Sequence, residues 1–317
     1  MKKINIAIIA IVLFAIACSK DRTMLLGDGN PTPEKPNSGF AAVSKEAFDK
    51  LGAQPERKTI KNQDDLPFVG SQGTKVWLFD RDLRMPDGSI VSYPFEIELL
   101  ELLTPKDMIL HLMPTVSRGR LLTTGGQVNI RAYKDGKELK VTKFNSTQII
   151  VPAQGRVDGL MDLFYGEETK DGIVDWIESD TSSVPGQKPR NIYGNDGAYF
   201  LFPNRLGWIN IDKFYEFTEA KTQIAFSSEN PPLDKIVIFL YFPDLKSLMQ
   251  TYGEVSGEVP VGRTVKIIAM SISDDEKEED RVYHSFFQDL VVADKQKVEI
   301  KLAPTTKESL LSYLESL

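Results

Sequence analysis

Residues 125–132, Gly-Gly-Gln-Val-Asn-Ile-Arg-Ala, carry the pattern that decides the fold of this chain. Val128, Ile130 and Ala132 alternate with polar neighbours. Successive side chains of a β-strand point to opposite faces, so this alternation predicts a strand with one buried side and one solvent-facing side. The Gly125-Gly126 pair before it predicts a turn.

The same period of two extends to both sides of this stretch. Turn sequences separate the alternating segments, at residues 86–89 (Pro-Asp-Gly-Ser) and at Asp135-Gly136. Residues 70–166 are therefore predicted to form an antiparallel β-domain. Its other alternating apolar positions are Val76 and Leu78, and Phe95, Ile97 and Leu99.

A second β region is predicted over residues 198–303. Residues 236–242 are continuously apolar, as in a central strand that is covered on both faces. Leu245, Leu248 and Met249 suggest a short helix after Pro243. The fold class is therefore all-β and mainly antiparallel, with one or two β-sandwich-like domains and short helices. Further alternation occurs at Val265, Ile267 and Ala269, and at Val298, Ile300 and Leu302.

A polar stretch, residues 167–197, separates the two β regions. A connection of this length is usually functional or interdomain, so it is interpreted as a linker. Trp176 within it is expected to pack back onto a domain.

The N-terminus has the features of a lipoprotein signal peptide over residues 1–17. Lys2 and Lys3 precede an apolar run, residues 4–16, that is too short to span a bilayer. The run ends immediately before Cys18, which is the one cysteine of the chain. We therefore expect Cys18 to carry lipid and to anchor the protein in the cell envelope, at the outer membrane.

Residues 18–69 then comprise the lipidated cysteine, a flexible tether and a short helix. The stretch 27–39 is rich in Gly and Pro, with almost no apolar residue, so it cannot form a core. Ser44 is a candidate N-cap, and Phe48 and Leu51 would share one face of the helix. Because Cys18 is consumed by lipid, no intrachain disulfide is expected.

Residues 304–317 are predicted to form an amphipathic helix. Thr305, Thr306 and Glu308 are able to cap its start. Leu310, Leu314 and Leu317 follow at spacings of four and three, so they lie on one side. Two interpretations remain open: the stripe closes the second β region, or it docks in the groove of a partner.

The sequence carries no enzyme signature. The two histidines, His111 and His284, are far apart and lack metal-ligand spacing. There is no Gly-x-Ser-x-Gly elbow and no phosphate-binding glycine loop. We therefore predict no catalytic residue, no cofactor and no metal. The net charge of −7 argues against a nucleic-acid partner.

Two acidic segments are candidate cation sites. Asp80, Asp82 and Asp87 precede Gly88, but residues 83–86 break the spacing of a calcium loop. Residues 274–280 (DDEKEED) are interpreted as a solvated hairpin tip that protects neighbouring strand edges. A weak divalent-cation site there is the alternative.

Aromatic residues near the second β region are the remaining binding candidates. Exposed rings on β-sandwiches mark recognition surfaces, whereas buried rings fill the core. The candidate partner or glycan surface consists of Trp208, Phe214, Tyr215 and Tyr241.

Two stretches resemble secreted and lipid-anchored proteins of the Bacteroidetes. They are residues 113–126 (MPTVSRGRLLTTGG) with the strand that follows, and residues 207–214 (GWINIDKF). The second is similar to a recurrent Gly-Trp-Ile-Asn-Cys-Asp-x-Phe segment, with Ile211 in place of Cys. This family is largely uncharacterised, so the resemblance implies an envelope location and a β-rich fold but no activity. Residues 19–21 (Ser-Lys-Asp) also resemble the charged surface-export signals of that group, which implies surface exposure.

Together these features predict a non-catalytic, lipid-anchored envelope protein that binds an envelope protein or a glycan, or serves as an assembly module. The alternative is an extracytoplasmic hydrolase that acts on glycan or peptide through scattered carboxylates. A pocket with two facing carboxylates would favour the hydrolase, whereas an exposed aromatic strip would favour glycan binding.

Overall fold

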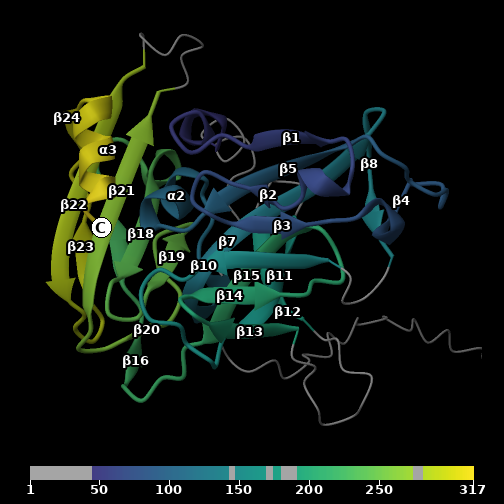
Figure 1. The fold of residues 1–317 in the computed structure, drawn as a ribbon. Helices are drawn as coiled ribbons and strands as arrows, with labels where there is room; N and C mark the ends of the chain where they lie inside the picture. The colour runs from purple at the N-terminus through teal and green to yellow at the C-terminus, as the bar shows by residue number, and fades with distance from the viewer. Residues whose placement is uncertain (1–44, 143–146, 169–173, 180–190, 274–280) are drawn as a thin grey trace, which may run out of the picture. The chain divides into compact units, whose positions relative to one another are not determined.

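The computed structural model describes residues 45–142, 147–168, 174–179, 191–273 and 281–317. By its contacts the chain separates into Met1–Asn30 and Pro31–Leu317, and every described residue belongs to the second unit. The fold is all-β and mainly antiparallel with short helices, which confirms the predicted fold class (Figure 1). Cys18, the tether, residues 180–190 and the acidic run 274–280 lie outside the described residues.

An eight-stranded sheet contains residues 125–132. Its long strand β7 pairs on one side with β5 and on the other with β15, and Val128, Ile130 and Ala132 are buried as predicted. The strands, in sheet order, are β1 (Glu56–Ile60), β5 (Phe95–Leu102), β7 (Arg120–Lys134), β15 (Gly207–Phe214), β11 (Asp162–Glu168) and β12 (Val174–Glu178), with β6 (Val116–Ser117) and β8 (Lys137–Glu138) paired to β7.

A five-stranded sheet packs on one face of the eight-stranded sheet and completes a β-sandwich. Its inner side chains, among them Val76, Ile149 and Leu201, share one core with Ile130 and Ile209 of the first sheet. The strands, in sheet order, are β13 (Ile192–Asn195), β14 (Ala198–Leu201), β10 (Gln148–Pro152), β3 (Lys75–Trp77) and β2 (Phe68–Val69).

A third sheet covers part of the other face of the eight-stranded sheet. Phe164 and Trp176 of the first sheet share a second core with Phe239 and Ile268 of the third. A further core on the opposite side of β18 contains Ile238 and Val298. The strands, in sheet order, are β19 (Ser247–Thr251), β18 (Val237–Phe242), β21 (Thr264–Ile272), β22 (Tyr283–Val291) and β24 (Ala303–Thr305).

Short pairs and helices complete the described part of the chain. The pairs are β4 (Leu83–Arg84) with β9 (Lys140–Val141), β16 (Lys221–Thr222) with β20 (Val259–Pro260), and β17 (Ala225–Ser227) with β23 (Lys297–Glu299), the last one parallel. The helices are residues 45–49, α2 (Pro105–Leu110) and α3 (Lys307–Glu315), with the 3-10 turns η1 (Gln63–Asp65), η2 (Asp80–Asp82) and η3 (Leu233–Lys235). None of the described helices has the length and apolar character needed to cross a bilayer.

The predicted helix at the C-terminus forms and lies against the third sheet (Figure 1). Thr306 is its N-cap, and its Oγ1 accepts a hydrogen bond from the backbone N–H of Ser309. Leu310 and Leu314 are fully buried in the second core, and Leu317 packs at its edge. The leucine stripe is therefore turned into the protein and does not present a free docking face.

The predicted division of the chain at residues 167–197 differs from the structure. Val174–Glu178 forms β12 of the first sheet and Ile192–Asn195 forms β13 of the second, so the expected linker supplies two strands of the sandwich. Trp176 packs inward as expected, and its Nε1 donates a hydrogen bond to the Pro114 carbonyl at 2.8 Å. Residues 198–214, assigned to the second region, also belong to the sandwich, because β14 and β15 pair with its strands.

The predicted short helix after Pro243 is wrong. Residues 243–246 form a turn in which Lys246 has a φ of 47°, and Ser247–Thr251 continues as β19, antiparallel to β18. All five residues of β19 are buried, so apolar side chains occur on both of its faces. In a short strand of this kind the spacing of Leu245, Leu248 and Met249 imitates a helical stripe.

Candidate functional site

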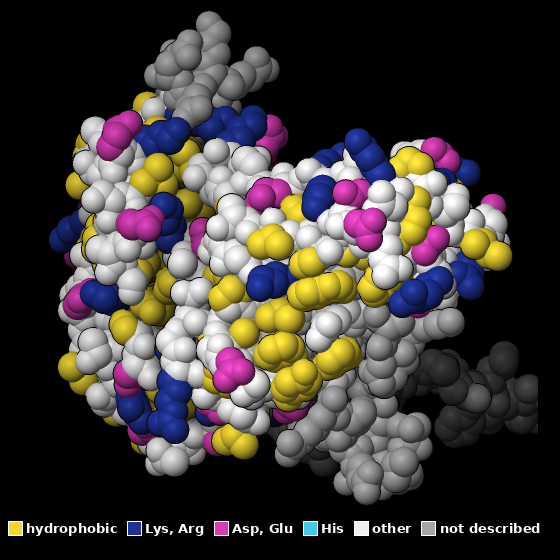
Figure 2. Space-filling model, in the orientation of Figure 1, with side chains coloured by type: hydrophobic (Ala, Val, Ile, Leu, Met, Phe, Trp, Pro, Cys, Tyr) yellow, Lys and Arg dark blue, Asp and Glu magenta, His cyan; other side chains and the backbone are white. Residues whose placement is uncertain are grey.

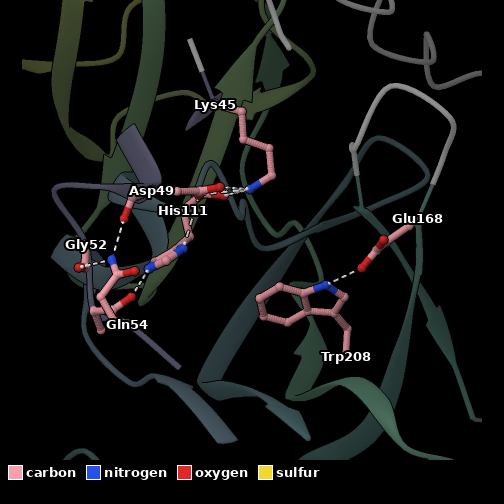
Figure 3. Close-up of polar contacts among 8 residues, drawn as sticks. Lys45, Asp49, Gly52, Gln54, His111, Glu168 and Trp208 are labelled. Atoms are coloured by element: carbon pink, nitrogen blue, oxygen red, sulfur yellow. Dashed lines mark hydrogen bonds and ion pairs between the residues drawn. The ribbon is translucent and has the colours of Figure 1, made fainter. Parts of the chain in front are cut away.

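Trp208 is the second residue of the segment that carries the family resemblance, and contacts within the chain hold its ring in place. Its Nε1 donates a hydrogen bond to Glu168 Oε1 at 2.8 Å (Figure 3). Its ring meets the fully buried ring of Trp176 edge-on, with 6.5 Å between the centroids. Trp208 is only partly exposed and fills the edge of the second core.

Phe214, at the other end of β15, is also enclosed by its neighbours. The Phe164 ring packs edge-on against it at 5.5 Å, and the Arg120 guanidinium lies 3.9 Å from its centroid. Both contacts stabilise the ring in place.

Two buried polar residues lie between these rings on the same face of β15. The Asn210 Nδ2 donates a hydrogen bond to Asp212 Oδ2 at 2.6 Å, and both residues are completely enclosed. Burial raises the pKa of the Asp212 carboxyl well above its usual range. The four side chains of the pattern Trp-x-Asn-x-Asp-x-Phe are spaced two residues apart, so they lie on one side of the strand, and this side faces inward.

The remaining two predicted aromatics lie elsewhere. Tyr241 is buried in the second core. The Tyr215 hydroxyl donates a hydrogen bond that is shared by both carboxylate oxygens of Glu219, at 2.8 and 2.9 Å. That bond, with a second from Arg263, lowers the pKa of Glu219 to about 2. The structure does not bring Trp208, Phe214, Tyr215 and Tyr241 together on one surface.

His111 is held by contacts with residues near the start of the described chain. It is buried, with Nε2 3.0 Å from the Ala53 carbonyl oxygen and Nδ1 3.2 Å from Asp49 Oδ1 (Figure 3). Lys45 pairs with the same carboxylate at 2.9 Å, so the network fixes residues 45–54 against the end of α2. His284 lies opposite Ser271 in the third sheet. Within the described ranges no three His, Cys, Asp or Glu side chains are placed to hold a metal ion.

The outer face of the five-stranded sheet carries partly exposed aromatic and apolar side chains. Along β14 and the residue that follows it, Tyr199 and Leu201 face the core whereas Phe200 and Phe202 face outward. Figure 2 shows hydrophobic side chains gathered over β10, β14 and β13 on this side. We define the outer face by Val69, Lys75, Trp77, Gln148, Ile150, Tyr193, Phe200 and Phe202.

Strand register aligns these side chains in two rows across the sheet. Tyr193 pairs with Phe200, Phe200 with Ile150, Ile150 with Lys75, and Lys75 with Val69. The Tyr193 and Phe200 rings are parallel within 2°, with centroids 4.8 Å apart. Tyr193 is 45% exposed and Val69 48% exposed.

The second row mixes rings with hydrogen-bonding groups. Trp77 pairs with Gln148, and Phe202, one residue beyond the end of β14, continues this row; its ring also stacks on Tyr193 at 6.0 Å. Among the described residues, none accepts a hydrogen bond from the Trp77 indole or forms an ion pair with Lys75. The outer face therefore presents ring carbons interspersed with hydrogen-bonding groups that have no such partner in the described part of the chain.

Sequence reasoning missed Trp77, Tyr193, Phe200 and Phe202. Residues 198–202 (Ala-Tyr-Phe-Leu-Phe) are apolar throughout, so no polar residue indicates which side faces water. The single available signal was the period of two around Val76, which places Lys75 and Trp77 together on the side opposite the core.

Comparisons with known proteins give no relative. No protein-family model, no curated protein and no solved structure matches this chain significantly.

Proposed function

We propose that this protein is a lipid-anchored component of the cell envelope that binds glycans, without catalysis, through its outer face. The observation that carries the proposal is the outer face of the five-stranded sheet, where four aromatic side chains stand in two rows with apolar and hydrogen-bonding groups. Contiguous exposed apolar surface marks a binding site on a soluble domain. The lipid anchor rests on the signal segment and on Cys18.

The composition of the outer face favours a glycan over a protein. A sugar ring presents C–H groups on one side and hydroxyls around its rim. Trp77 and Tyr193 offer apolar ring surface, and the side chains of Gln148 and Lys75 offer hydrogen bonds beside it. Because Tyr193 and Phe200 already stack on each other, little side-chain freedom is lost when a ligand binds.

The alternative of a carboxylate-based hydrolase receives less support. A glycosidase needs a carboxyl with a raised pKa that reaches the scissile bond. Asp158 and Asp244 line a cleft, but Asp158 is paired with Lys213, and Asp244 is paired with Arg263, which also binds Glu219. The pKa of Asp158 is lowered by its bond to Lys213, and Asp212, whose pKa is raised, is completely enclosed.

Removal of rings from the outer face should abolish glycan binding. We expect the double variant Trp77→Ala/Tyr193→Ala to lose at least about tenfold in affinity, or 1.4 kcal/mol. Affinity electrophoresis in gels that contain glucan, mannan, pectin or solubilised peptidoglycan measures this loss. Ile90→Ala is the control, because Ile90 is a 79% exposed apolar residue outside the outer face. A polymer that retards the wild type and the double variant equally, or a panel that retards neither, would refute the proposal.

The anchor has its own test. Replacement Cys18→Ser removes the thiol that accepts lipid, so the protein should remain an unprocessed precursor that incorporates no labelled palmitate. We expect the wild type to be labelled in the same culture. Normal labelling of the variant would show that lipid is attached elsewhere.

A further inference from the structure

A cleft of about 360 Å³ opens where the loop after β10 faces the turn between β18 and β19. This volume falls within the range of small-molecule sites, about 300–1,000 Å³. Thr123, Thr124 and Gly125 of β7 form one wall, and Tyr199 and Tyr215 also line it. A smaller hollow of about 120 Å³ adjoins the cleft and shares Thr124, Gly125, Gln154 and Lys246 with it.

Cationic side chains outnumber carboxylates in the lining of this cleft. Three cations, Arg156, Lys213 and Lys246, and two carboxylates, Asp158 and Asp244, line the cleft. Lys213 Nζ lies 2.6 Å from Asp158 Oδ2, and Arg263, which also pairs with Glu219, places its Nη1 2.9 Å from Asp244 Oδ2. The cleft is therefore locally positive in a chain of net charge −7.

Neither Arg156 nor Lys246 has a carboxylate partner within the described part of the chain. Arg156 is exposed and forms no ion pair there. The Lys246 ammonium donates a hydrogen bond to the Gln154 carbonyl oxygen at 2.6 Å. This bond holds the Lys246 side chain across the cleft. A guanidinium and an ammonium that face one cavity are suited to an anion, and the planar guanidinium fits a carboxylate bidentately.

Neutral hydrogen-bonding groups accompany the two cations. The hydroxyl oxygen of Tyr199 accepts the backbone N–H of Asp158 at 3.0 Å, so its own proton remains for another acceptor. Thr123 and Gln154 also line the cleft. A ligand that carries hydroxyls as well as a carboxylate would use these groups.

We propose that the cleft binds a small hydroxylated carboxylate, of the sugar-acid class, with its carboxylate between Arg156 and Lys246. This site is separate from the outer face and does not depend on the function proposed for it.

Isothermal titration of the full-length protein with glucuronate, galacturonate, glucose and inorganic phosphate tests the assignment. We expect a uronate to bind and glucose not to bind. Arg156→Gln should weaken uronate binding about tenfold, with an unchanged melting temperature because Arg156 is exposed. Arg205→Gln, a cation that stacks on Tyr165 outside the cleft, is the matched control and should bind normally.

Removal of a negative charge from the cleft provides a second test. Asp158→Asn removes a negative charge from the cleft and releases Lys213, so uronate affinity should rise by roughly threefold or more. Weaker binding in this variant, equal binding of glucose, binding of phosphate alone, or no binding of any probe would each overturn the assignment.

Discussion

A chain that ends at Thr306, and so lacks α3, should be strongly destabilised or insoluble. Leu310 and Leu314 are fully buried in the second core, and burial of each side chain contributes about 1.5–3 kcal/mol. Tyr313 also stacks on Phe287, with ring centroids 3.6 Å apart. Loss of about 3–6 kcal/mol is a large part of the 5–15 kcal/mol that stabilises a typical domain.

Chemical denaturation of the point variant Leu314→Ala complements this truncation where the shorter chain is insoluble. Leu314→Ala should lower the free energy of unfolding by about 2–5 kcal/mol. Ser312→Ala, on the exposed side of the same helix, should change it by less than about 0.5 kcal/mol. An unchanged unfolding curve after truncation, together with loss of a co-purifying envelope partner, would instead support a projecting docking helix.

The replacement Ile130→Ala should cost about 2–5 kcal/mol, because Ile130 is fully enclosed between the two sheets of the sandwich. Its neighbour Asn129 lies on the opposite side of β7, and its side-chain oxygen has no hydrogen-bond partner in the described part of the chain. Asn129→Ala should therefore cost less than about 1 kcal/mol. Thermal unfolding of the two variants gives their midpoint temperatures for comparison. Equal decreases in both midpoints would mean that the register of β7 is wrong.

Local alternation predicted which side of a strand is buried. Val76, Ile97 and Ile130 all face the sandwich core as expected, since the period of two is a local property of the strand. The all-β class and the C-terminal helix followed from the same kind of local pattern.

Alternation did not predict which strands are neighbours. β15 lies between β7 and β11, although about 70 residues separate it from β7 and the expected linker intervenes. Such pairing depends on contacts between distant segments, which leave no periodic trace in one sequence. The predicted boundary between two β regions was consequently misplaced.

The candidate site was mispredicted for a related reason. Trp208 and Phe214 belong to the motif that suggested a binding surface. In the structure these side chains lie on the same inward-facing side of β15 as the buried residues Asn210 and Asp212. The rings that face outward, such as Phe200, belong to segments that are apolar on both sides. Whether such a ring is exposed depends on which sheet faces are covered by a further layer. The arrangement of layers is a property of the tertiary structure.

The three tryptophans of the chain allow a direct measurement of whether glycans bind at the outer face. Trp77 lies on the outer face, Trp176 is fully buried, and Trp208 is bound to Glu168 on the other side of the sandwich. The indole N–H signals in a ¹H–¹⁵N spectrum are followed while an oligosaccharide of a polymer that retards the protein is added. We predict a saturable shift of the Trp77 signal, with those of Trp176 and Trp208 unchanged. A shift confined to Trp208, or saturation of binding with the Trp77 signal unmoved, would contradict glycan binding at the outer face.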